Sequence, residues 1–297
     1  MNANTNFMDT MVTEVSAKIN EERVRDLFLA AVANSCTEKI QDAAASSTGK
    51  YHPAFAHGKG GLLRHIRAAV HFVEKYSVSF GLNPLEKDIA VAAAALHDLC
   101  KSGINWDSKY TVFEHPILVR ALIDSCSLLG DDAILWGQIC DAIDSHMGCW
   151  NKPTQRDVEN RLDEIIDSFK LVGRHVPNNI RDMSLQEIQD ALALPTPKTP
   201  VQIVVATADY KSSDSALHLK GIFDNEAEYW EEAMSSYEKE EPASEKQKNY
   251  VSVLYTQYKE KNPDSTKWDW IQNAVSGFGK KKAGSVIWQL KKELENV

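Results

Sequence analysis

The sequence predicts an all-α protein. Apolar residues recur with the 3.6-residue period of an amphipathic helix in successive segments, while no segment alternates apolar and polar residues as a half-buried strand does. An Asn-Gly hairpin signal is also absent from the sequence. The 297 residues are 43% hydrophobic and 25% charged, which is typical of a globular chain. This composition excludes a disordered chain, a collagen-like fibre and a disulfide miniprotein.

Five amphipathic helices are expected in the first half of the chain. Proline is favoured in the first helical turn, so Pro84 and Pro116 mark two helix starts. Gly148 is expected to end the last of the five. The uncharged run 202–208 suits a buried strand as well as a buried helix, so its type stays open. The five helices are expected within 21–45, from Leu62, from Pro84, from Pro116 and over 134–147.

Shifts in composition predict the domain organisation. We expect an N-terminal helical segment over 1–49, a main domain over 50–221, and an acidic hinge with a small C-terminal helical appendage over 222–297. Within the main domain, residues 151–200 are interpreted as an insertion. This segment begins polar, ends in the proline-rich PTPKTP, and holds two short helical patterns between, 158–171 and 184–194.

The net charge limits the partners. The chain carries 33 basic and 42 acidic residues, a formal charge of −9, whereas broad binding to long duplex nucleic acid needs a basic face. The charge is uneven, since 222–246 has nine acidic and two basic residues while 247–297 has nine basic and five acidic. The tryptophans and lysines of 247–297 suit base stacking, but the core of a small helical cap is the preferred interpretation. A phosphate ligand held at one pocket by local cations or metals is not excluded.

The N-terminal sequence, the longest apolar run and the cysteines predict a cytoplasmic protein without a membrane partner. The N-terminus lacks a basic region followed by an apolar stretch, so no signal peptide is expected. The longest unbroken apolar run, Ile89 to Leu96, is far too short to span a membrane. Five cysteines without a CxxC pair favour reduced thiols, buried as small apolar residues.

Several histidines and aspartates follow apolar helix faces and are expected to point inward. His65 lies three residues after Leu62, and His146 lies three after Ile143. A single buried histidine is usually a core residue, but a buried carboxylate is costly unless it is paired. Imidazoles and carboxylates brought together can compensate one another by binding a divalent first-row metal. The four positions that carry this argument are His65, His97-Asp98, His146 and Asp209.

The order of these residues resembles the H…HD…D pattern of HD-domain metal-dependent phosphohydrolases. The flanking sequences GGLLRH, AAALHDLCKSG and ATADYKSS agree with this pattern. The likeness extends to the HD domains of bacterial 3′→5′ exoribonucleases and of phage-type proteins, and covers roughly 50–220. It implies an HD-domain helical bundle with a metal site in its middle.

The resemblance also implies a set of ligands for one or two divalent cations, with Mn, Fe and Mg all compatible. The first metal would be held by His65, His97, Asp98 and Asp209, with Asp98 placed to bridge to a second. His115 and His146 would complete that second site. Many relatives have two adjacent histidines where this chain has His146-Met147, so this chain offers one histidine there to the second metal instead of two. Glu114 is a spare carboxylate, although a solvent-facing glutamate is the preferred interpretation.

A phosphohydrolase needs cationic groups for the phosphate as well as a metal. Asp98 and Lys101 are the expected catalytic residues, since in this superfamily the HDxxK lysine typically contacts phosphate. Lys101 shares the face of His97 if that helix continues; a surface lysine at a helix C-terminus is the alternative. The other expected substrate-binding residues are Lys59, Tyr110 and Lys211. Weaker candidates are His52 and His57 in the loop before His65, and Arg120; His175 and His218 are assigned to the surface.

The expected function is hydrolysis of a phosphoester of a nucleotide or short oligonucleotide by a metal-activated water. Two alternatives remain open. Dinuclear HD sites also occur in di-iron oxygenases, which share this ligand set. A metal-retaining binding or regulatory module without turnover is the other, because a complete site does not prove activity. The oligomeric state is not predicted.

Overall fold

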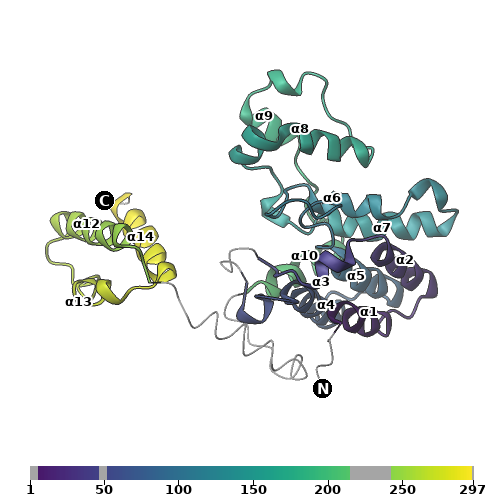
Figure 1. Ribbon diagram of the computed structural model, residues 1–297, viewed down its shortest axis with the longest axis horizontal. Helices are drawn as coiled ribbons and strands as arrows, with labels where there is room; N and C mark the ends of the chain where they lie inside the picture. Colours follow the sequence, from purple (N-terminus) through teal and green to yellow (C-terminus); the bar gives the residue numbers. More distant parts are fainter. Residues whose placement is uncertain (1–5, 47–51, 215–241, 296–297) are drawn as a thin grey trace. The chain divides into compact units, whose positions relative to one another are not determined.

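A computed structural model describes residues 6–46, 52–214 and 242–295, and over these ranges the regular secondary structure is helical (Figure 1). Within the same ranges, strand-like pairing is limited to two isolated bridges, Lys101 with Gly103 and Pro242 with Gly279. The predicted all-α class is therefore confirmed. The α-helices are α1 (Phe7–Ser16), α2 (Glu22–Ala33), α3 (Thr37–Gln41), α4 (Gly61–Ser79), α5 (Pro84–Leu96), α6 (His115–Leu118), α7 (Asp131–Asp144), α8 (Gln155–Leu171), α9 (Leu185–Ala191), α10 (Pro200–Ser212), α12 (Glu245–Lys261), α13 (Ile271–Ala274) and α14 (Lys280–Glu295).

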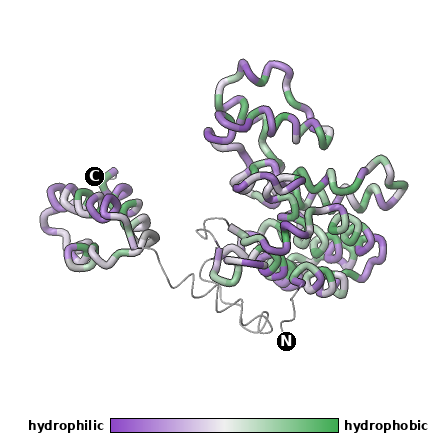
Figure 2. Tube along the Cα trace, in the orientation of Figure 1, coloured by the Kyte–Doolittle hydropathy of each residue, from purple (hydrophilic) through white to green (hydrophobic). Residues whose placement is uncertain are grey.

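Helices α4, α5 and α10 form the centre of the first of two compact units. Helix α4 packs against both α5 and α10, and α5 also packs against α7. In Figure 2 the helices of this unit carry hydrophobic stretches, and α5 is buried without a break from Asp88 to Leu96. The buried face of α5 is rich in alanine, which lets its neighbours approach closely. This packing brings the end of α5 next to the second turn of α4 and the end of α10.

Capping residues explain where the central helices begin. Asn83 and Glu86 form a reciprocal capping box at the start of α5, with Pro84 in the first turn. Thr199 and Gln202 do the same for α10, where Pro200 occupies the first turn. The predicted helix start at Pro84 is confirmed by this geometry, whereas the start at Pro200 was not among the predictions. The open question at 202–208 is settled as a helix, because the cap and proline fix a helical start just before it.

Three expected helices differ in extent from those observed. The helix expected within 21–45 is two helices, because α2 ends at Ala33 and the Ser35 hydroxyl bonds the Val32 carbonyl, a terminal group of that helix. The helix expected from Pro116 is a single α-turn, α6, that continues as a 3₁₀ turn over Val119–Leu122. Helix α7 begins at Asp131 and ends at Asp144, three residues earlier at each end than expected.

The loop before α4 packs tightly on the start of that helix. Gly60 has φ +71°, and a Cβ there would lie 2.8 Å from the Phe7 ring. A Cβ at Gly61 would lie 2.3 Å from the Ala56 carbonyl oxygen. Glycine is required at both positions, at the first for backbone conformation and at both for space.

The buried guanidinium of Arg64 holds this loop in place through hydrogen bonds to its backbone carbonyls. Its Nε donates to the Phe55 carbonyl at 2.5 Å, and one Nη donates to the carbonyls of His57 and Lys59, each at 2.9 Å. Arg64 directly precedes His65 on α4. The loop is therefore held beside the helix turn that carries the first predicted metal ligand.

The segment expected as an insertion forms two helices with their own small core. Both predicted helical patterns are present, as α8 and α9. Their apolar faces pack with residues in and next to α6. The buried residues of this cluster are Phe113, Ile117, Ile165, Ile166, Phe169, Val176, Ile180, Ile188, Leu192 and Leu194. The boundaries 151–200 for the insertion stay a prediction.

The second compact unit contains α12, α13 and α14 around a separate apolar core. Trp268 and Ile271 belong to that core, as the helical-cap interpretation predicts, whereas Trp270 and Trp288 are exposed. Most of the predicted acidic hinge, as well as His218, lies outside the described residues, so the domain boundaries remain predictions. In the part of the chain that the structure describes, no helix is both long and apolar enough to cross a membrane.

Candidate metal centre

Six buried or half-buried side chains meet at the centre of the first unit, and together we call them the His/Asp cluster. Helix α4 supplies His65 and α10 supplies Asp209, while His97 and Asp98 follow directly after α5. The other two members are His115, at the start of α6, and His146, just after α7. Elements far apart in the sequence therefore deliver all six predicted ligands to one place.

Three of the four imidazoles are oriented by a backbone carbonyl. The Nδ1 atoms of His97, His115 and His146 each lie 2.7 Å from the carbonyl oxygen three residues earlier. A carbonyl only accepts hydrogen bonds, so Nδ1 carries the proton in each ring. The lone pair of a neutral ring is then on Nε2, the atom that faces the cluster. This arrangement prepares each ring to bind a metal through Nε2.

Ser212 orients the fourth imidazole. Its hydroxyl donates to the Asp209 carbonyl oxygen at 2.8 Å and lies 3.1 Å from Nδ1 of His65. Because the single hydroxyl proton is used on the carbonyl, Oγ accepts the proton of Nδ1, and Nε2 of His65 is free to coordinate. Sequence reasoning missed this residue, although it stands within the quoted flank ATADYKSS.

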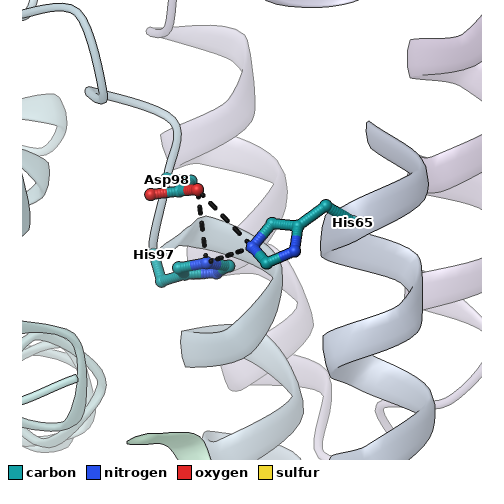
Figure 3. A group of neighbouring side chains, drawn as sticks. All are labelled: His65, His97 and Asp98. Atoms are coloured by element: carbon teal, nitrogen blue, oxygen red, sulfur yellow. Dashed lines mark hydrogen bonds and ion pairs between the residues drawn. The ribbon is translucent and has the colours of Figure 1, made fainter. Parts of the chain in front are cut away.

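The two oxygens of Asp98 face different histidines. Its Oδ2 lies 3.6 Å from Nε2 of His65 and 3.5 Å from Nε2 of His97, an arrangement drawn in Figure 3. Its Oδ1 lies 3.4 Å from Nε2 of His115, on the other half of the cluster. His115 in turn lies 3.3 Å from His146, Nε2 to Nε2. Asp98 therefore stands between the two halves of the cluster, with one oxygen toward each.

Asp209 contacts the same two histidines, His65 and His97, that face Oδ2 of Asp98. Its Oδ1 lies 3.1 Å from Nε2 of His65 and 3.4 Å from Nε2 of His97. Of the six side chains it is the one with appreciable exposure, 22% against at most 4% for the others. The cluster therefore meets solvent at Asp209.

Neighbouring charges keep the carboxylates of Asp98 and Asp209 ionised. Burial by itself would raise the pKa of Asp98, but Lys101 and His97 outweigh it and hold that pKa well below its usual range. Burial also opposes ionisation of Asp209, but the neighbouring His65 and His97 hold its pKa well below its usual range. Both carboxylates are therefore charged despite their surroundings.

The pKa values of His97 and His146 are shifted in opposite directions. Burial would lower the pKa of His97, but Asp98 and the hydrogen bond to Asp209 raise it to about 9. Burial and the neighbouring His97 lower the pKa of His146 to about 3. A site that concentrates this much opposed charge in an apolar core fits a bound cation, which compensates the carboxylates and needs neutral imidazoles.

The spacing of the donor atoms also suits a divalent cation. Three groups each offer one ligand atom per residue, with all atoms of a group within 4.8 Å of one another. Imidazole nitrogen with carboxylate oxygen suits first-row divalent metals. The groups are His65, His97 and Asp98; His97, His146 and Asp209; and Asp98, His115 and His146.

Lys101 reaches the cluster by another route than expected. Helix α5 ends at Leu96, so the shared helix face does not form. The chain turns instead, and Nζ of Lys101 lies 2.5 Å from Oδ2 of Asp98. The lysine side chain is mostly buried there, so the surface alternative is wrong.

The remaining predicted substrate residues have other neighbours. Lys59 is 3.1 Å from Asp42, and Lys211 is 2.7 Å from Asp214, both at exposed positions. The exposed ring of Tyr110 lies under the ammonium of Lys109. Their roles stay predictions. The weaker candidate Arg120 forms a buried ion pair with Asp144 and a surface pair with Asp141.

His52, from the loop before α4, lies against the cluster. Its ring meets the ring of His65 edge to face, with centroids 4.9 Å apart. Burial, with His65 and Lys101 nearby, lowers the pKa of His52 to about 2. Its Nδ1 is buried without a hydrogen-bond partner. Among the loop candidates, His52 is the one that the described structure brings to the site.

Glu114 is not the solvent-facing glutamate that the sequence favoured. It is 2% exposed, and its Oε1 accepts a hydrogen bond of 2.6 Å from Arg161 of α8. A buried carboxylate next to His115 would be costly without that guanidinium. The pair therefore ties the inserted helix to the segment that carries a predicted ligand.

Replacing Arg161 by methionine should lower the free energy of unfolding by about 2–3 kcal/mol, because the Glu114 carboxylate stays buried without its cation. Glu164→Gln is the matched control, since it removes the exposed partner of the same guanidinium and should cost less than about 0.5 kcal/mol. Urea unfolding of the two variants measures both values. Equal effects would show that the buried pair contributes nothing of its own.

Comparison with protein families identifies the domain. The family model described as HD domain matches residues 62–214, about half of the chain, and this span includes the whole His/Asp cluster. The chain belongs to the HD domain family. No curated protein and no solved structure matches the chain. With its His and Asp residues in place, this HD-domain protein is a metal-dependent phosphohydrolase, and its substrate carries a phosphate.

Proposed function

We propose that this HD-domain protein hydrolyses a phosphoester of a nucleotide or of a short oligonucleotide. The observation that supports this most is Asp98, which turns one oxygen to each half of the His/Asp cluster and holds Lys101 on one of them. A pair of cations bridged by a carboxylate suits in-line displacement at phosphorus. The proposed ligands are His65, His97, Asp98 and Asp209 for one metal, and His115 and His146 with Asp98 for the other.

Bound divalent cations would lower the pKa of a water molecule and stabilise negative charge on the phosphate. The protein's own groups orient these ligands and exclude water from the buried side of the cluster. Lys101 places a positive charge at the Asp98 carboxylate, where it can also meet a phosphate oxygen. The open side at Asp209 is where the phosphoester enters.

We propose a nucleotide or a short oligonucleotide as the substrate because of the charge of the chain and the small size of the reacting group. The acidic chain disfavours long duplexes, whereas a single phosphoester needs only the local cations of the cluster. Mn, Fe and Mg are each compatible with a set of imidazoles and carboxylates. A nucleotide and the end of a short oligonucleotide present the same reacting group.

The test is product release by purified, Mn- or Fe-loaded protein from deoxynucleoside triphosphates, cyclic dinucleotides and short RNAs, with elemental analysis of the same samples. We expect product from at least one class and about two metals per chain. His115→Ala should reduce the metal count to about one. No product from any class would refute the proposal, and oxygen uptake by the Fe-loaded protein would favour the oxygenase alternative instead.

A further inference from the structure

Two exposed aromatic rings stack beside the His/Asp cluster. Trp150, in the 3₁₀ turn Gly148–Trp150, and Tyr210, on α10, lie with ring centroids 6.1 Å apart and planes inclined by 22°. They are 59% and 65% exposed. A ring buried in a core needs no further explanation, but two exposed aromatic rings aligned with one another form an apolar surface in water.

Both rings stand next to cluster residues in the chain. Tyr210 directly follows Asp209, so their Cα atoms are about 3.8 Å apart. Trp150 follows His146 by four residues, across the turn that ends α7. Asp209 is also the most exposed member of the cluster. The aromatic pair therefore stands on two segments that each carry a cluster residue, and one ring follows the cluster's most exposed member.

A nearby cavity is unsuitable for an anionic substrate. A cavity of about 500 Å³ lies between the segment 102–118 and α8. Its acidic lining residues are Asp107, Glu114, Glu164 and Asp167. Its one lining guanidinium, Arg161, already binds two of these carboxylates. A phosphate ester would be repelled there, so this cavity is not a suitable place for the substrate.

We infer that Trp150 and Tyr210 form a stacking platform for the nucleobase of the substrate whose phosphoester lies at the His/Asp cluster. This deepens the proposed function and rests on it. Stacking on aromatic rings contributes about 5- to 150-fold in affinity per base and tolerates any base, since every base presents a π face. The substrate class is then a base-bearing phosphoester with little discrimination among bases.

The experiment compares binding of adenosine 5′-monophosphate and ribose 5-phosphate to Mn-loaded full-length protein by isothermal titration calorimetry. The two probes share the sugar phosphate and differ in the base. We expect the nucleotide to bind about 5- to 150-fold more tightly. Trp150→Ala and Tyr210→Ala should each remove most of that difference and leave ribose 5-phosphate binding unchanged, while Tyr210→Phe should preserve it.

Trp288→Ala is the matched control, because it removes a tryptophan of similar exposure (62%) from the other compact unit and should change neither affinity. Equal affinity of the two probes for the wild-type protein would overturn the platform, as would alanine variants that weaken both probes alike. Hydrolysis separates the two proposals. Turnover of base-free and base-bearing phosphoesters at equal rates would overturn the platform alone, whereas a base-dependent affinity without turnover of any ester would overturn the phosphohydrolase alone.

Discussion

Replacing Asp98 by asparagine is expected to remove bound metal and to lower phosphoester hydrolysis by at least about 10³-fold. The carboxylate is the group that faces both halves of the His/Asp cluster, through Oδ2 toward His65 and His97 and through Oδ1 toward His115. An amide of the same shape carries no charge to bind a cation or to hold Lys101. Metal-assisted charge stabilisation contributes several kcal/mol, and each 1.36 kcal/mol is about tenfold in rate. Elemental analysis and initial rates measure the two losses.

Asp88→Asn separates this effect from a general loss of structure. Asp88 is also buried and lies on α5, ten residues before Asp98, but its Oδ2 accepts backbone hydrogen bonds from Asn20 at 2.8 Å and Glu21 at 2.7 Å. Its replacement should lower the unfolding free energy by about 1–3 kcal/mol and leave the metal content unchanged. If Asp98→Asn retained its metal, or if both variants lost metal equally, the bridging role of Asp98 would be refuted.

The members of the cluster could be predicted because local periodicity reports burial. His65 and His146 continue apolar helix faces, and the doublet His97-Asp98 follows the most apolar run in the chain. A helix places residues three or four apart on one face, so inward direction follows from sequence alone. That these faces converge on one point depends on how α4, α5 and α10 pack, which the family resemblance implied and periodicity did not.

Groups whose environment depends on distant partners could not be predicted. Glu114 looks like a surface glutamate because its cation, Arg161, lies 47 residues away on an inserted helix. Ser212 is followed by a second serine, Ser213. The sequence does not show which of the two contacts His65, because this depends on the register of α10. Lys101 was expected on a continuing helix, yet it reaches Asp98 because the chain turns after Leu96. In each case the deciding contact is tertiary.

Replacing Arg64 by methionine is expected to lower the free energy of unfolding of the first unit by about 3–5 kcal/mol. Its guanidinium is fully buried and donates to the backbone carbonyls of Phe55, His57 and Lys59. Methionine fills much of the space but leaves three carbonyl groups without their donor, and each hydrogen bond to a charged group contributes about 1.5–3 kcal/mol. Part of that cost is relieved if the loop opens to water.

Arg67→Met provides the control on the same helix face of α4. Arg67 binds both carboxylate oxygens of Glu14 at 2.7 Å, but Glu14 is half-exposed and can be hydrated once its partner is gone. We expect a cost of about 1 kcal/mol. Hydrogen exchange of metal-free protein, followed separately in peptides of α4 and α12, measures the stability of each compact unit separately. A loss confined to α4 and larger for Arg64 than for Arg67 is the expected pattern. Equal losses in the two variants would mean that the loop before His65 is held by its glycine packing, and that the buried guanidinium is not what fixes it.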